Sequence, residues 1–231
     1  MQGHVGESDN GKLILYKAWF CPFAERALIA CKEKSIDFIE KEIDPYKKTE
    51  EWLSINPNGT VPALTQNGKN LYESSICVEY INDCYNNDVN LLPLDPYDRA
   101  YVRLWGDITG KKIVPFYYKT MKTPEEDDKK KSIEDLLAGI ELFSKETQKR
   151  EGPFFMGNVF GYVDLMLFPF VYRCNAVLGR YRDFKVPKEE KYQAYNRWYE
   201  ACLEHESVKS ILQDQEKLFD GYNSKYTNPR L

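Results

Sequence analysis

Cys21 follows a short apolar run and directly precedes a proline, in the segment Cys21-Pro22-Phe23-Ala24. Pro22 suits the first position of a helix, because that position needs no backbone hydrogen-bond donor. We therefore expect the Cys21 sulfur at a helix N-terminus, where unpaired N–H groups and the helix dipole favour a thiolate. The pattern predicts a reactive cysteine. The alternative is a small, buried hydrophobic residue at a strand end.

This segment has the length of a C-x-x-C redox motif, but Ala24 stands where the second cysteine would be. A dithiol enzyme resolves its mixed disulfide internally, whereas a mixed disulfide on Cys21 would need attack by an external thiol. Glutathione is the abundant candidate for that thiol. The sequence leaves open whether another low-molecular-weight thiol takes its place.

Val61-Pro62 and Glu73-Ser74 are two further candidates for ligand binding. A cis bond before Pro62, beside a strand, would present the N–H and C=O of Val61 to an extended peptide, and a trans proline ending a loop is the alternative. At a helix start, Ser74 and nearby N–H groups could hold a carboxylate while Glu73 pairs with an ammonium. Together these groups would recognise an amino-acid head group, unless the pair is only a helix cap.

Other classes of site find little support. The only histidines are His4 and His205, and no two of the six cysteines have C-x-x-C spacing, which argues against a zinc site and a histidine-assisted nucleophile.

Lys and Arg total 32 against 36 Asp and Glu, so we expect no nucleic-acid partner. Apolar runs such as 165–171 are too short to span a membrane, and the polar start of the chain does not resemble a signal peptide. We expect a cytoplasmic protein.

Two domains are expected from the order of the elements. The first 85 residues predict strand, helix, strand, short helix, hairpin and helix, whereas strand signals largely disappear after the prolines of 91–96. Helices are expected over 97–118, 163–177 and 192–202. The predicted organisation is a flexible segment 1–11, an α/β domain 12–88, a linker 89–96, an all-α domain 97–220 and a polar tail 221–231.

Three separated blocks also carry a resemblance to a known family. They are Phe20-Cys21-Pro22-Phe23-Ala24-Glu25-Arg26, then Asn56-Pro57-Asn58-Gly59-Thr60-Val61-Pro62, then Tyr72-Glu73-Ser74. In this order they resemble the cytosolic glutathione transferase superfamily, specifically its omega class. The likeness continues through Leu91-Leu92-Pro93 and Asp95-Pro96-Tyr97 into the helical half.

The resemblance implies a thioredoxin-like N-terminal domain, an all-α C-terminal domain, a homodimer, glutathione as co-substrate and no metal. It makes Cys21 the catalytic residue that forms a mixed disulfide with glutathione. The glutathione-binding residues that it implies are Phe23, Lys48 (or the adjacent Lys47), Val61, Pro62, Glu73 and Ser74. A second substrate is expected between the domains, with a wall formed by Trp105, Tyr118, Phe170 and Arg173.

One segment departs from the family pattern. The family usually places Ser or Thr at the helix N-cap that Gly161 occupies here, while Asp164 remains at the third helical position. Glycine caps nearly as well as serine in peptides, so we expect only a small effect on helix stability.

The implied activity is glutathione-dependent thiol transfer to a small-molecule or protein disulfide, with deglutathionylation and dehydroascorbate reduction as its reactions. One alternative is a conjugating transferase, in which bound glutathione attacks an electrophile with little help from Cys21. Another is a non-enzymatic protein of the same fold that binds glutathione or another ligand.

Overall fold

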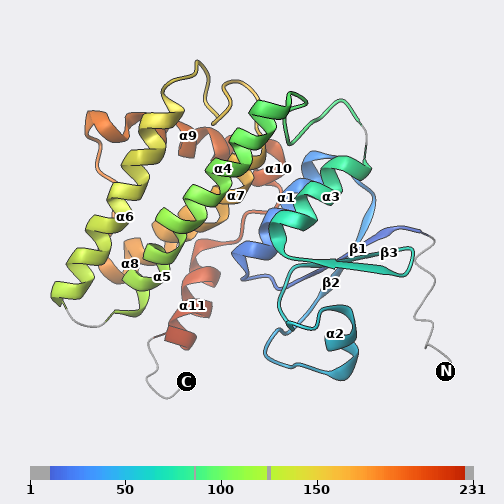
Figure 1. Ribbon diagram of the computed structural model, residues 1–231. Coiled ribbons are helices and arrows are strands. Elements are labelled where there is room, and N and C mark those ends of the chain that lie inside the picture. Colours follow the sequence, from blue (N-terminus) through green and yellow to red (C-terminus); the bar gives the residue numbers. More distant parts are fainter. Residues whose placement is uncertain (1–10, 86, 124–125, 227–231) are drawn as a thin grey trace. The chain divides into compact units, whose positions relative to one another are not determined.

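The computed structural model describes residues 11–85, 87–123 and 126–226. It divides into two compact units, Met1–Val89 and Asn90–Leu231, each with its own fold (Figure 1). This division falls inside the segment 89–96 that the sequence marks as a linker. Apart from Gly11, the expected flexible segment 1–11 lies outside the described residues.

The first unit is a four-stranded mixed sheet with three helices, in the order that the sequence predicts. The strand order is β2-β1-β3-β4, with β1 parallel to β2 and antiparallel to β3, and with β3 antiparallel to β4. This arrangement is the expected thioredoxin-like α/β fold. Its elements are β1 (Leu13–Lys17), α1 (Pro22–Glu33), β2 (Phe38–Glu42), α2 (Glu50–Ile55), β3 (Ala63–Gln66), β4 (Lys69–Tyr72) and α3 (Ser74–Cys84).

Both faces of this sheet are covered by helices. Figure 1 shows α1 and α3 together on one face and α2 on the other. Alternate residues of a strand point to opposite faces. Accordingly, Ile14 and Tyr16 of β1 pack with Trp52 of α2, with the Tyr16 and Trp52 ring centroids 5.5 Å apart. Asn67 and Gly68 join β3 to β4 with positive φ angles of 51° and 72°, as the tight hairpin requires.

Helices α4 to α11 form the second unit, whose described residues contain no β-strand, as expected. Helix α7 is buried at every position and packs against α4, while α6 packs against α5 and α9. The helices are α4 (Pro96–Lys112), α5 (Val114–Lys122), α6 (Glu126–Thr147), α7 (Tyr162–Arg173), α8 (Gly179–Arg182), α9 (Gln193–Glu204), α10 (Glu206–Lys209) and α11 (Gln215–Tyr226), with a π turn at Cys174–Leu178 and a 3-10 turn at Glu190–Tyr192.

Two helix boundaries differ from the expectation. The helix expected over 97–118 is interrupted at Ile113, because Pro115 has no N–H to donate and fits only the first turn of a new helix, α5. The polar tail expected from residue 221 is wrong for residues 221–226, which belong to α11. Leu218 and Tyr222, four residues apart, are both buried, so the helix continues past Gly221.

A membrane-spanning helix is absent from the described part of the chain. No helix there is both long enough and apolar enough to cross a bilayer.

Candidate functional site

Cys21 is the N-cap residue of α1, with Pro22 in the first turn, as the sequence predicts. Its own N–H donates to the Ala18 carbonyl at 2.9 Å, and its carbonyl accepts from the Glu25 N–H at 3.1 Å. The half-buried thiol lies 3.7 Å from the Val61 carbonyl oxygen, to which it donates. The sulfur therefore lies at the open end of a twelve-residue helix and beside the loop that carries Pro62.

The loop before β3 is held in shape by a buried asparagine. The Asn56 amide donates to the Thr60 carbonyl at 2.6 Å, and its side-chain oxygen accepts from the Asn58 N–H at 3.0 Å. The Val61–Pro62 peptide bond at the end of this loop is cis, which decides between the two alternatives that the sequence left open. Val61 itself packs in the same apolar cluster as Cys21 and Trp52.

Glu73 and Ser74 lie at the start of α3. Glu73 is the N-cap residue with φ +71° and ψ 116°, a conformation that side-chain-bearing residues rarely adopt, and its side chain is exposed. Backbone strain of this kind is often kept at functional sites. Ser74 is buried at the first helical position, where N–H groups without helical partners favour an anion.

A chain of polar contacts joins Lys48 to Glu73. The Lys48 ammonium donates to the Asn58 carbonyl at 3.3 Å, and the Asn58 amide donates to the Glu73 carboxylate at 3.3 Å. The Lys48 side chain also covers Gly59, because a Cβ atom there would lie 3.0 Å from the Lys48 Cδ and Cε atoms. Asn58 was not among the predicted site residues, although it lies within the second block of the resemblance.

Arg26 is a second residue that the sequence reasoning missed. Arg26 is 5% exposed, and its guanidinium donates to the Ser74 hydroxyl at 3.0 Å and lies 5.0 Å from the centre of the Phe23 ring. Phe23 and Arg26 lie three residues apart on α1, so both follow from the helix that Cys21 begins. The signal was available, because Arg26 closes the first block of the resemblance.

Burial distinguishes Cys21 from four of the other cysteines. Burial raises the pKa of the Cys31, Cys174 and Cys202 thiols far above the ordinary value and raises the pKa of Cys77 to about 12. Such thiols stay protonated and unreactive at neutral pH. Cys84, at the end of α3, is exposed.

The comparisons with known proteins agree with this arrangement. The family model described as "Glutathione S-transferase, N-terminal domain" matches residues 20–84, and the one described as "Glutathione S-transferase, C-terminal domain" matches residues 106–211. Glutathione S-transferase U19 of Arabidopsis thaliana is 33% identical over 210 residues, covering 90% of this chain and 92% of that protein. The chain belongs to the glutathione S-transferase family.

Similar solved structures include members of the omega and tau classes of the glutathione S-transferase family. Glutathione transferase Omega 3C from Trametes versicolor is 36% identical with a TM-score of 0.80, covering 91% of this chain and 92% of that chain. The tau class enzyme from mango, Mangifera indica, is 27% identical with a TM-score of 0.86, covering 94% and 99%. The superfamily expected from the sequence is thus confirmed, while the omega class is not, because the chain is similar to tau class as well as omega class structures.

Three of the four residues expected to line the second-substrate site of this glutathione S-transferase are buried in the structure. Phe170 and Arg173 are 0% exposed, and the Arg173 guanidinium donates to the Pro169 carbonyl at 2.8 Å. Trp105 is 6% exposed and packs on Phe155, with ring centroids 5.5 Å apart. Only Tyr118, edge-on to Phe170 at 6.4 Å, stays half-buried. The expectation is not met by Phe170 and Arg173, because neither has surface that a ligand could reach.

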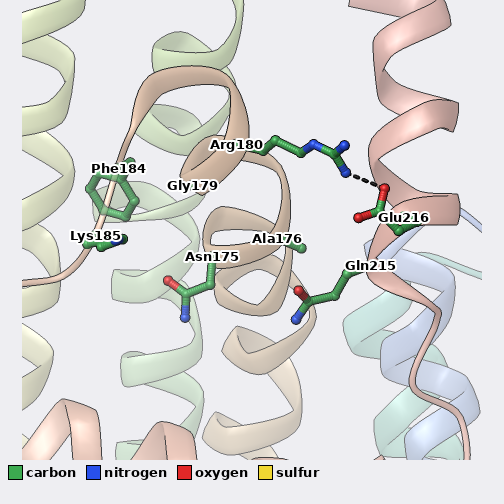
Figure 2. Close-up of a pocket in the computed structure, with 8 residues that line it drawn as sticks. All are labelled: Asn175, Ala176, Gly179, Arg180, Phe184, Lys185, Gln215 and Glu216. Carbon is green, nitrogen blue, oxygen red and sulfur yellow. Dashed lines mark hydrogen bonds and ion pairs between the residues drawn. The ribbon is translucent and has the colours of Figure 1, made fainter.

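Within the helical unit, a hollow of about 400 Å³ lies between the π turn, α8 and the start of α11 (Figure 2). Arg180 extends across it to an ion pair with Glu216, and its guanidinium also lies 4.1 Å from the centre of the Phe219 ring. The hollow contains none of the residues singled out from the sequence. Since its main cation and anion pair with each other, we assign it no role in glutathione binding.

A metal site is absent from the part of the chain that the structure describes. No group of three or more His, Cys, Asp or Glu side chains there lies close enough together to hold a metal ion.

Proposed function

We propose that this glutathione transferase is a glutathione-dependent thiol transferase of omega type, with Cys21 as its catalytic residue. The observation that carries the proposal is the half-buried Cys21 thiol at the N-terminus of α1, beside the Val61 carbonyl. Helix N-termini stabilise thiolates, and a thiolate is the nucleophile in disulfide exchange. Deglutathionylation and dehydroascorbate reduction are the reactions proposed.

The proposed cycle has two exchange steps. The Cys21 thiolate attacks the glutathione sulfur of a mixed disulfide, so that the bond from Cys21 to glutathione forms and the acceptor leaves as a thiolate. A second glutathione thiolate then attacks that glutathione sulfur, which releases oxidised glutathione and regenerates the Cys21 thiolate. The second thiol must come from solution, because Ala24 replaces a resolving cysteine.

Glutathione is proposed to bind along the first unit, across α1, the loop before β3 and the start of α3. The backbone of Val61, before cis Pro62, would pair with the cysteinyl part of the ligand in the manner of a strand. Ser74 and the N–H groups of α3 would hold the glutamyl carboxylate, and Glu73 its ammonium. Phe23 and Lys48 flank these positions, and Asn58 joins Lys48 to Glu73.

Conjugation of glutathione to an electrophile is the second candidate, and the likeness to tau class and plant glutathione S-transferases favours it. In that reaction the glutathione thiolate itself is the nucleophile, and Cys21 would only orient it. The two candidates therefore differ in whether Cys21 forms a covalent bond with glutathione.

Turnover with two substrates separates the candidates. Wild type and Cys21→Ser would be assayed with hydroxyethyl disulfide plus glutathione, and with chlorodinitrobenzene plus glutathione. We expect the variant to lose roughly a hundredfold or more in disulfide turnover, because the covalent nucleophile is gone. If Cys21→Ser keeps the disulfide turnover of wild type, or if conjugation is the only activity found and is faster in the variant, the conjugating transferase is favoured. Absence of glutathione binding at millimolar concentration would favour a binding protein for another ligand.

A further inference from the structure

Arg26 connects the helix that carries Cys21 to the helix that carries Ser74. Both side chains are buried, and the guanidinium of Arg26 donates to the Ser74 hydroxyl at 3.0 Å. Arg26 lies on α1, whose N-cap is Cys21, and Ser74 is the first residue of α3; the two helices pack against each other. The contact thus joins the proposed nucleophile's helix to the proposed carboxylate site.

The direction of this hydrogen bond constrains the serine proton. A guanidinium has only donors, so the Ser74 oxygen must be the acceptor towards Arg26. A hydroxyl has a single proton, and that proton must therefore point away from Arg26. A ligand carboxylate at the start of α3 is an acceptor for it, and the positive charge behind the hydroxyl strengthens that hydrogen bond.

We propose that Arg26 is a positioning residue that orients the Ser74 hydroxyl towards the glutamyl carboxylate of glutathione. The inference rests on the proposed function, since it takes Ser74 as the carboxylate site. In this role Arg26 acts through Ser74. Its guanidinium also lies 5.0 Å from the Phe23 ring centre, so one buried cation supports two of the proposed binding residues.

Binding of two ligands that differ in one carboxylate tests this role. The ligands are glutathione and γ-aminobutyryl-cysteinylglycine, which lacks the carboxylate of the glutamyl residue. Binding is measured by calorimetry, and every protein also carries Cys21→Ser so that no disulfide forms between residue 21 and the ligand. We expect Arg26→Gln to raise the Kd for glutathione roughly tenfold, because a charge-assisted hydrogen bond is weakened, and to change the Kd for the analogue less than about twofold.

Two further variants keep the test decisive if Arg26→Gln does not fold. Arg26→Lys retains the charge and should restore part of the preference for glutathione, while Ser74→Ala should lose the preference without any change at Arg26. Lys32→Gln, on the same helix and ion-paired with Glu40, is the matched control and should leave both Kd values unchanged. Thermal unfolding of each variant checks the fold.

The outcomes separate this inference from the proposed function. If the Arg26 variants lose affinity for both ligands equally, or keep the wild-type preference, the positioning role is wrong. If the Cys21→Ser protein with Arg26 and Ser74 intact binds both ligands equally, Ser74 is not the carboxylate site and the inference also fails. If that protein binds neither ligand at millimolar concentration, the proposed glutathione function itself is wrong.

Discussion

At the scale of single residues, position decides the role of each cysteine in this protein. Cys31 and Cys77 are 0% exposed within the first unit, where burial raises the pKa of both thiols. Cys21 instead lies half-buried at a helix end, beside a backbone carbonyl. The same residue type is therefore a packing element in one place and a candidate nucleophile in another.

The backbone of Glu73 provides a prediction at this scale. Its φ of +71° strains any residue with a Cβ atom. The free energy of unfolding of Glu73→Gly should therefore be about 1 kcal/mol higher than that of Glu73→Ala. Both variants lack the carboxylate, so the comparison isolates the backbone. Urea unfolding measures the difference.

Glu79, within α3, is the matched control for this comparison. At this helical position the Glu79→Gly variant should be less stable than the Glu79→Ala variant by about 1 kcal/mol. An alanine variant at residue 73 as stable as the glycine variant would contradict the assignment of strain.

The sequence predicted individual residues well only where local chemistry determines them. Pro22 placed Cys21 at the start of α1, and Ser74 was expected at a helix start and is the first residue of α3, although Glu73 and not a serine is its N-cap. The cis bond before Pro62 and the positive φ of Glu73 depend on tertiary packing, which no local pattern encodes. For the same reason the sequence could not reveal that Arg173, an arginine in an apolar helix, is fully buried.

At the scale of elements, α7 depends on one buried carboxylate. Asp164 accepts from the N–H groups of Gly161 and Phe155 at 2.9 Å and from the Trp198 indole at 2.7 Å. Gly161 has no side chain to complete a reciprocal cap. A Cβ atom there would lie 3.0 Å from the Leu91 carbonyl, so close backbone packing accounts for the departure from serine or threonine.

The titration of Asp164 gives a prediction for stability. Burial raises its pKa from 3.8 to about 6, against the opposing effect of its three donors and of His205. Since the folded protein then binds the proton more tightly than the unfolded chain, this contribution to stability is full below pH 3.8 and is lost as the pH rises to about 6.

The test compares urea unfolding of wild type and Asp164→Asn between pH 4 and 7. The free energy of unfolding of wild type, relative to the variant, should fall on the order of 2 kcal/mol as the pH rises through this range. Comparison with the variant cancels the titration of the groups that do not interact with Asp164. A constant or rising difference would mean that Asp164 is ionised throughout.

Two glycines give opposite predictions for helix packing. A Cβ atom at Gly139 of α6 would lie 2.3 Å from the backbone oxygen of Lys112 at the end of α4, whereas one at Gly110 of α4 would meet no atom within 4 Å. Gly139→Ala should therefore lower the free energy of unfolding by about 1–3 kcal/mol. Gly110→Ala should raise it by about 0.5–1 kcal/mol, because alanine favours the helix. Equal effects of the two variants in urea unfolding would contradict this difference.

Element types were more predictable than element boundaries. Strand and helix periodicities gave the order of the first unit because each segment is short and bounded by turn residues such as Asn67 and Gly68. The interruption at Ile113 was missed although Pro115 marks it, and the π turn at Cys174–Leu178 escaped prediction because apolar residues continue through it. Where a helix is apolar on all sides, as α7 is, periodicity cannot mark its end.

At the scale of the whole molecule, the proposed glutathione residues all lie in the first unit, Met1–Val89, and the helical unit holds the residues expected for the second substrate. None of the proposed glutathione residues comes from the helical unit. Acceptor specificity has to be sought elsewhere than Phe170 and Arg173, which are enclosed.

A homodimer is proposed from the family resemblance. Light scattering on a sizing column should give twice the 27.1 kDa mass of the chain at micromolar concentration. A mass of one chain that does not change with protein concentration would contradict the proposal.

The central claim is that Cys21 itself carries glutathione during turnover, and intact mass spectrometry after a single exposure to a glutathione mixed disulfide tests it most directly. Wild type and the exposed-cysteine control Cys84→Ser should each gain one glutathione that reduced glutathione removes, and Cys21→Ser should gain none. Formation of the adduct on Cys21→Ser, or failure of the adduct to form on Cys84→Ser, would contradict the claim.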